Sequence, residues 1–79
     1  MELLIIAPTY KKEFSIAWLE LETTVGNFVI QPGHAPTILL LAPHQTATFC
    51  LKNGKQETIP ISGGIAHIQR DSATLLVDA

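Results

Sequence analysis

Histidine is the residue type in this sequence best suited to bind a metal ion or transfer a proton near neutral pH. His34, His44 and His67 lie in three separate segments, and Cys50 is the one cysteine. A zinc site typically needs closely paired ligands, or two histidines four residues apart on a helix. The spacing here does not favour a metal site. A small β-sandwich module that binds a metal or another ligand through these histidines is kept as the alternative function.

Ser62, His34 and Asp78 supply the residue types of a Ser–His–Asp catalytic triad, but Ser62 is not in the sequence context of a catalytic serine. Ser62 begins a Ser-Gly-Gly run, not the strand–turn–helix elbow that exposes a catalytic serine. The run could also suggest a phosphate site, yet no helix N-terminus follows it and no lysine adjoins it. Paired glycines that let two backbone segments approach closely are the favoured interpretation. We therefore predict no catalytic residue, no metal site and no cofactor.

Residues 31–36, Gln-Pro-Gly-His-Ala-Pro, predict a stiff loop between two apolar runs. Pro32 and Pro36 fix φ, remove backbone donors and push the preceding residues toward extended geometry. Gly33 follows a proline, as a type II turn requires. His34 is the only titratable side chain of the loop. It has two possible roles, a hydrogen bond to nearby backbone or a contact with a partner.

The elements that must hold this loop alternate apolar and polar residues with a period of two, which is typical of β-strands. We expect strands at residues 1–7, 16–24, 28–30, 37–41, 46–52, 55–61, 65–69 and 73–77, and a polar turn or short edge strand at 9–14. Turn signals recur about every eight to twelve residues, and no helical period is present. The pattern predicts one all-β domain over residues 1–79, a small flattened β-sandwich or barrel of about eight to ten short strands.

Local signals refine this prediction. Gly26-Asn27 between two alternating runs predicts a tight hairpin. Asn53-Gly54 predicts a type I′ hairpin, which needs φ > 0 at both central residues. Pro60 cannot donate to a ladder, so its strand is expected at a sheet edge or a bulge.

Tryptophan 18 stands out within the strand at 16–24. The alternation predicts Ala17, Leu19 and Leu21 on one face, and Trp18 on the other face among glutamates. A tryptophan on a polar face either covers a sheet edge or contacts a partner.

Composition narrows the function further. Hydrophobic residues make up 47% of the chain and charged residues 15%, so part of the apolar surface is expected to remain outside one small core and to serve an interaction. A net charge of −2 argues against nucleic acid as the ligand. No run reaches the length of a membrane-spanning helix and no signal peptide is evident. The lone cysteine, read as a small hydrophobe, fits a reducing compartment.

Two motifs together resemble the epsilon subunit of F-type ATP synthases. The segment from Gly26 to Pro36 is similar to that family's Gly-Glu-Leu-Gly-Ile run leading into Pro-Gly-His-Ala-Pro. Ser62-Gly63-Gly64 and the closing run Ala73 to Ala79 are similar to its Ser-Gly-Gly strand and its closing Val-Thr-Val-Leu-Ala-Asp strand. Their order and separation match across nearly the whole chain.

The resemblance implies a non-catalytic central-stalk subunit, part of the rotor in ion-driven ATP synthesis. It implies the gamma subunit and the loops of the c-ring as partners, with no direct membrane insertion. It also implies a peripheral location on the cytoplasmic face of a bacterial energy-transducing membrane. The partner-binding residues it suggests are Gly26, Asn27, Gln31, Pro32, Gly33, His34, Ala35 and Pro36, with Trp18 as a further candidate.

The sequence departs from the family pattern at several positions. Asn27 stands where the family usually has Glu, Val29 where it has Gly, and Pro43-His44 where it has Pro-Gly. Asn27 carries no charge for an ion pair with the ring, but its amide can still form hydrogen bonds. Family members usually continue into a helical hairpin that restrains ATP hydrolysis and, in some, binds ATP. Since this chain ends at Ala79, we expect neither self-inhibition nor nucleotide binding.

Overall fold

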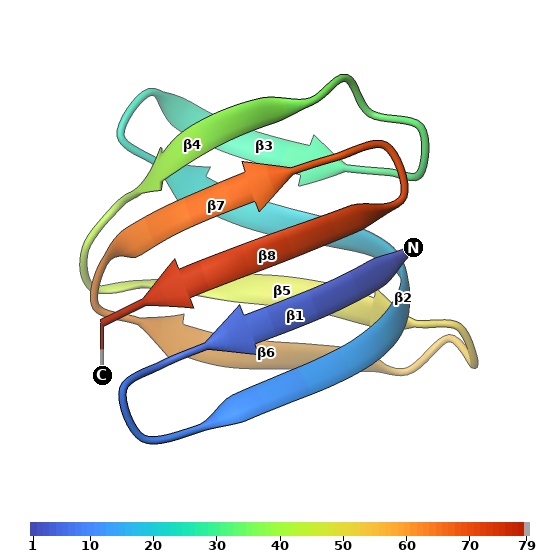
Figure 1. Ribbon diagram of the computed structural model, residues 1–79, viewed down its shortest axis with the longest axis horizontal. Coiled ribbons are helices and arrows are strands. Elements are labelled where there is room, and N and C mark those ends of the chain that lie inside the picture. The colour runs from blue at the N-terminus through green and yellow to red at the C-terminus, as the bar shows by residue number, and fades with distance from the viewer. Residues whose placement is uncertain (79) are drawn as a thin grey trace.

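Eight β-strands form two layers, and the long strand β2 belongs to both (Figure 1). The strands are β1 (Glu2–Ile6), β2 (Lys11–Thr23), β3 (Gly26–Ile30), β4 (Thr37–Leu41), β5 (Gln45–Leu51), β6 (Gln56–Ile61), β7 (Gly64–Ile68) and β8 (Ser72–Val77). The computed structural model describes residues 1–78. The molecule measures 27 × 25 × 17 Å, so the predicted flattened all-β sandwich is confirmed.

In one layer the strands run in the order β4, β7, β8, β1 and the first half of β2. In the other they run β3, the second half of β2, β5 and β6. The β1–β8 pair is parallel, and the other pairs are antiparallel. Alternate residues of each strand point between the layers and form one apolar core. Its largest fully buried side chains are Phe49, Leu3, Ile5, Ile16, Leu19, Leu21, Ile30, Ile68 and Leu75.

A bulge in β2 marks the place where this strand passes from one layer to the other. Ile16 pairs with Leu51 and Trp18 pairs with Cys50, which leaves Ala17 as an extra residue. Both Ile16 and Leu19 consequently face the core, while Ala17 is exposed. The predicted sharing of one face by Ala17 and Leu19 is therefore wrong, because the bulge shifts the alternation by one residue. β2 is also longer than expected. It begins at Lys11, inside the segment expected as a turn or short edge strand, because residues 11–15 pair with β1.

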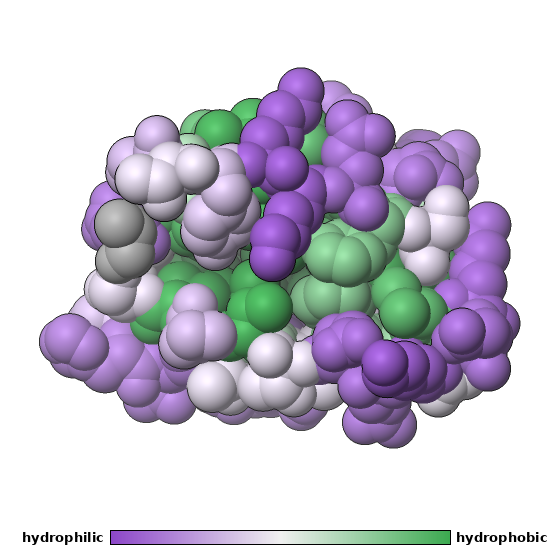
Figure 2. Space-filling view, turned by 90° about the horizontal axis from the view of Figure 1, so that it is seen from below, coloured by the Kyte–Doolittle hydropathy of each residue, from purple (hydrophilic) through white to green (hydrophobic). Residues whose placement is uncertain are grey.

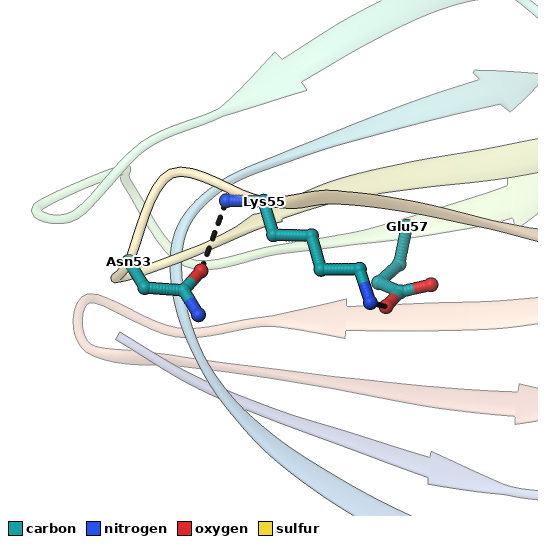
Figure 3. Close-up of polar contacts among 3 residues, drawn as sticks. All are labelled: Asn53, Lys55 and Glu57. Carbon is teal, nitrogen blue, oxygen red and sulfur yellow. Dashed lines mark hydrogen bonds and ion pairs between the residues drawn. The ribbon is translucent and has the colours of Figure 1, made fainter.

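The β5–β6 hairpin has a different turn from the predicted type I′. The Gly54 N–H donates to the Leu51 carbonyl over 2.9 Å, so Lys52 and Asn53 are the central residues of the turn. Gly54 has φ +92°, whereas Asn53 is not among the residues with positive φ. The Asn53 side-chain oxygen instead accepts the Lys55 N–H over 2.9 Å, as Figure 3 shows. This bond holds Asn53 outside the left-handed region that a type I′ turn needs.

The β2–β3 hairpin exists as predicted, but its turn lies earlier. Thr24 and Val25 form the turn, and Gly26 (φ +128°) and Asn27 already belong to β3. Thr23 holds the turn, since its hydroxyl donates to the Gly26 carbonyl over 2.7 Å and accepts the Val25 N–H over 3.2 Å.

Gly64 is the position where glycine is sterically required. It has φ +142° and lies against β8, where an added Cβ would collide with the Leu76 carbonyl oxygen and lie 2.9 Å from the Val77 Cα. The interpretation of Ser-Gly-Gly as a close approach of two backbones is confirmed. The edge position expected for Pro60 is also confirmed, because β6 ends its sheet.

Candidate partner-binding surfaces

The loop between β3 and β4 has the stiff turn that its sequence predicts. The His34 N–H donates to the Gln31 carbonyl over 3.1 Å, closing a turn with Pro32 and Gly33 at its centre. Gly33 has φ +87°, the conformation that the third position of a type II turn needs. The Gly33 N–H also donates to the Arg70 carbonyl over 2.7 Å, which ties the loop to the β7–β8 turn. The backbone of the loop is thus fixed both internally and from outside.

The His34 ring forms a hydrogen bond within this loop. Its Nδ1 lies 2.7 Å from the Ala35 carbonyl oxygen, and the side chain is half-buried. A carbonyl oxygen only accepts hydrogen bonds, so Nδ1 must carry the proton. In a neutral ring Nε2 is then left as an acceptor for a partner. The internal role predicted for His34 is present in the structure, and it leaves one nitrogen for the second role.

Asn27 lies at the opposite end of β3 from this loop. β3 runs between the β2–β3 turn and residues 31–36 along one side of the sandwich (Figure 1). With a rise of about 3.4 Å per residue, Asn27 and Pro32 are about 17 Å apart. The Asn27 amide nitrogen donates to Glu22 Oε1 over 2.7 Å and to Glu20 Oε2 over 3.2 Å. Its donor is therefore engaged by two carboxylates of the neighbouring strand.

Trp18 lies on the outer face of the layer that contains β3, as the alternation predicts. It is half-buried, and it lines a shallow hollow together with Glu20, Val29 and Gln31. Trp18 and the first residue of the 31–36 loop therefore adjoin one surface. Cys50, the partner of Trp18 in the ladder, lies beside Trp18 on the same face of the sheet and is 8% exposed.

The outer face of the layer formed by β4, β7, β8 and β1 is apolar. The sequence alone did not predict which residues form this face. Side chains that point away from the core meet in register across β4, β7, β8 and β1, as Leu40–Ile65–Leu76–Ile6 and as Ile38–His67–Thr74–Leu4. We call the six aliphatic members of these rows the apolar face: Leu4, Ile6, Ile38, Leu40, Ile65 and Leu76. Ile38 is 67% exposed, Leu40 58%, Leu76 48% and Ile65 40%.

A patch of this kind on a small soluble domain is typical of a protein–protein contact. The high apolar content of the sequence signalled such a surface, but only the pairing of the strands shows which residues form it.

The three histidines do not lie together in one site, and neither do the three residues of the hypothetical Ser62–His34–Asp78 triad. His34 lies in the β3–β4 loop, His44 in the β4–β5 turn and His67 on the outer side of β7. Within residues 1–78 no group of three or more His, Cys, Asp or Glu side chains is arranged to hold a metal ion. The Ser62 hydroxyl donates to the Asp78 carbonyl over 3.3 Å. His34 is at the other end of the sandwich, because the β3–β4 loop and the β6–β7 turn lie at opposite ends (Figure 1).

Residues 3–79 match the model of the family described as "ATP synthase, Delta/Epsilon chain, beta-sandwich domain". The chain belongs to this family. Among its relatives, the ATP synthase epsilon chain of Acinetobacter baumannii (strain ATCC 17978) is 40% identical over 53 residues, which are 67% of this chain and 37% of the relative. The epsilon chain of Psychrobacter arcticus is 38% identical over 63 residues, which are 80% of this chain and 45% of the relative. The chain therefore matches less than half the length of these family members.

The fold is also that of chains in solved ATP synthase structures. A chain of the mitochondrial ATP synthase of Euglena gracilis (OSCP/F1/c-ring) superposes with a TM-score of 0.88 at 24% identity, over 95% of this chain and 48% of that one. A chain of the Tetrahymena thermophila enzyme (central stalk/c-ring) superposes with a TM-score of 0.84 at 17% identity, over 100% of this chain and 63% of that one. Residues 1–78 contain no helical segment with the length and hydropathy of a membrane span.

Proposed function

We propose that this chain is a non-catalytic subunit of the central stalk, the rotor, of an F-type ATP synthase. It links the gamma subunit to the ring of c subunits during ion-driven ATP synthesis. The observation that carries the proposal is the match of residues 3–79 to the β-sandwich domain family. The presence of the same fold in a central-stalk and c-ring assembly supports it.

The apolar face is the surface we assign to gamma. Its four most exposed members, Ile38, Leu40, Ile65 and Leu76, retain between 40% and 67% of their surface. Burying a whole Leu or Ile side chain contributes about 1.5–3 kcal/mol, so covering the remainder of these four contributes about 3–6 kcal/mol. This is a useful share of a stable contact, which also has to overcome the loss of translational and rotational freedom.

The polar side of the sandwich around β3 is the surface we assign to the c-ring loops. It includes the residues suggested by the family resemblance: Gly26, Asn27, Gln31, Pro32, Gly33, His34, Ala35, Pro36 and Trp18. The fixed backbone of the 31–36 loop suits a contact that must keep its shape while the rotor turns. Because the Asn27 amide is bound to Glu20 and Glu22, it is these carboxylates that would meet a ring loop at that corner.

The proposed location follows from these contacts. The chain is held at the membrane through the ring and not through insertion of its own strands. In a bacterial enzyme this places it on the cytoplasmic face of the energy-transducing membrane.

Co-purification tests the proposal. The chain should co-purify with gamma and with the c-ring when all three are expressed together. A chain that stays monomeric in the presence of gamma, and whose deletion leaves ATP-driven proton pumping unchanged, would contradict the proposed function.

A further inference from the structure

A hollow that is separate from the proposed partner-binding surfaces lies on the side of the sandwich where no strand pairing joins the two layers. The first half of β2 and the edge strand β6 border a hollow of about 250 Å³. Figure 2 views the molecule from this side and shows apolar surface between two borders of polar residues. The hollow is lined by Ile5, Tyr10, Lys12, Phe14, Phe49, Glu57 and Ile59.

The inner part of the hollow is apolar and largely aromatic. Ile5 and Phe49 form its floor and are both 1% exposed. Phe14 and Ile59 form its walls and are half-buried. The Phe14 and Phe49 rings lie 4.8 Å apart between centroids and are tilted by 44°. Rings at this separation and tilt form a favourable aromatic pair, which gives the inner part of the hollow an aromatic surface.

The rim of the hollow carries charge, and its two charged groups differ in their partners. The Glu57 carboxylate is paired with the Lys55 ammonium at 3.3 Å, as Figure 3 shows. The Lys12 ammonium lies 5.3 Å from the Tyr10 ring centroid. Within residues 1–78 no carboxylate lies within ion-pair distance of Lys12. The charge left to bind a ligand at this rim is therefore positive.

A β-strand is a poor occupant of this gap. Pro60 has no N–H to donate at the open edge of β6, and Lys12 and Glu57 turn charged side chains toward the gap. Proline and inward-pointing charges are the devices by which sheet edges resist pairing with further strands.

We propose that the hollow binds a small aromatic carboxylate. The ring lies between Phe14 and Ile59, above Phe49, and the carboxylate binds the Lys12 ammonium. The volume is below the 300–1,000 Å³ or so of sites for drug-sized ligands, which restricts the ligand to about one ring and a short acidic chain. This site is independent of the proposed stalk function, since it lies apart from the apolar face and the 31–36 loop.

A titration of the ¹⁵N-labelled chain with 3-phenylpropionate tests the proposal, with 3-phenylpropan-1-ol as the neutral match. We expect the amide signals of Tyr10, Lys12, Phe14 and Ile59 to shift, and the acid to bind about fivefold more tightly than the alcohol, the factor that corresponds to an exposed ion pair. Lys12→Met keeps an apolar stem and should remove this difference. Lys52→Met, on the β5–β6 turn outside the hollow, should retain it.

Three results would overturn the proposal. Equal binding of acid and alcohol to the native chain would show an apolar hollow without anion selectivity. Shifts confined to β4, β7 and β8 would place the ligand on the apolar face. Retention of the acid's advantage in the Lys12→Met chain, with its spectrum otherwise native, would show that Lys12 does not bind the carboxylate.

Discussion

Replacement of Leu40 by serine should weaken binding to gamma and leave the fold intact. Leu40 lies at the β4 end of the apolar face, next to Ile65 in the sheet, with 58% of its surface exposed. In the free chain the substitution removes only the part of the side chain that is already buried, so the free energy of unfolding should fall by about 0.6–1.3 kcal/mol. In the complex it removes an aliphatic side chain from the proposed interface.

The size of the effect follows from the exposed fraction. Burial of a whole leucine contributes about 1.5–3 kcal/mol, and somewhat more than half of that is still to be gained when gamma covers Leu40. The loss of binding free energy on Leu40→Ser should be about 0.9–1.7 kcal/mol, which raises the Kd for gamma about five- to twentyfold.

Isothermal titration of purified gamma into the chain measures this change. Val29→Ser is the matched control, because Val29 is also an aliphatic strand residue, 51% exposed, but it lies on the outer face of the other layer. Its Kd for gamma should stay within about twofold of the native value. A larger loss for Val29→Ser than for Leu40→Ser would show that we have assigned gamma to the wrong face.

Three further predictions test the local arguments. Gly64→Ala should lower the free energy of unfolding by about 3 kcal/mol or more in chemical denaturation, because the added Cβ meets the β8 backbone. The control Gly54→Ala, with no atom within 4 Å of its Cβ, should lower the free energy of unfolding by about 1–2 kcal/mol. Equal losses in the two variants would contradict the steric argument. His44→Gly should raise the melting temperature, because His44 has φ +58°, a conformation that is strained for histidine and not for glycine. The strain released should exceed the free-energy cost of the more flexible unfolded chain by about 0.5–1 kcal/mol. A lower melting temperature would mean that the histidine side chain stabilises the turn. His34→Ala removes an exposed hydrogen bond and should lower the free energy of unfolding by at most about 1 kcal/mol. The same substitution should weaken attachment to the c-ring in a reconstitution assay. A large loss of stability with normal attachment would show that His34 serves only to hold the loop.

The features that follow from neighbouring residues could be predicted from the sequence. The Pro32-Gly33 turn is one, since proline at its second position and glycine at its third specify the conformation locally. The edge position of Pro60 is another, because the missing donor excludes it from the middle of a ladder. The all-β class follows in the same way from the period-two alternation over most of the chain.

The features that depend on distant segments could not be predicted. The bulge at Ala17 arises where β2 leaves β1 and joins β5, a change of partner that alternation alone does not encode. The Asn53 turn depends on a competition between a side-chain hydrogen bond and a left-handed backbone. The apolar face needs four strands from separate parts of the chain in correct register, so Ile38 and Leu40 could equally be read as core residues from the sequence of β4.

Methyl cross-saturation from gamma to the labelled chain tests the central claim most directly. With gamma protonated and the chain deuterated except for Ile, Leu and Val methyl groups, only methyls in contact with gamma lose intensity. We predict losses at Ile38, Leu40, Ile65 and Leu76, and unchanged signals at Val25 and Val29, which are exposed outside the apolar face. Losses confined to Val25 and Val29, or no losses in a mixture at concentrations that should form the complex, would contradict the account.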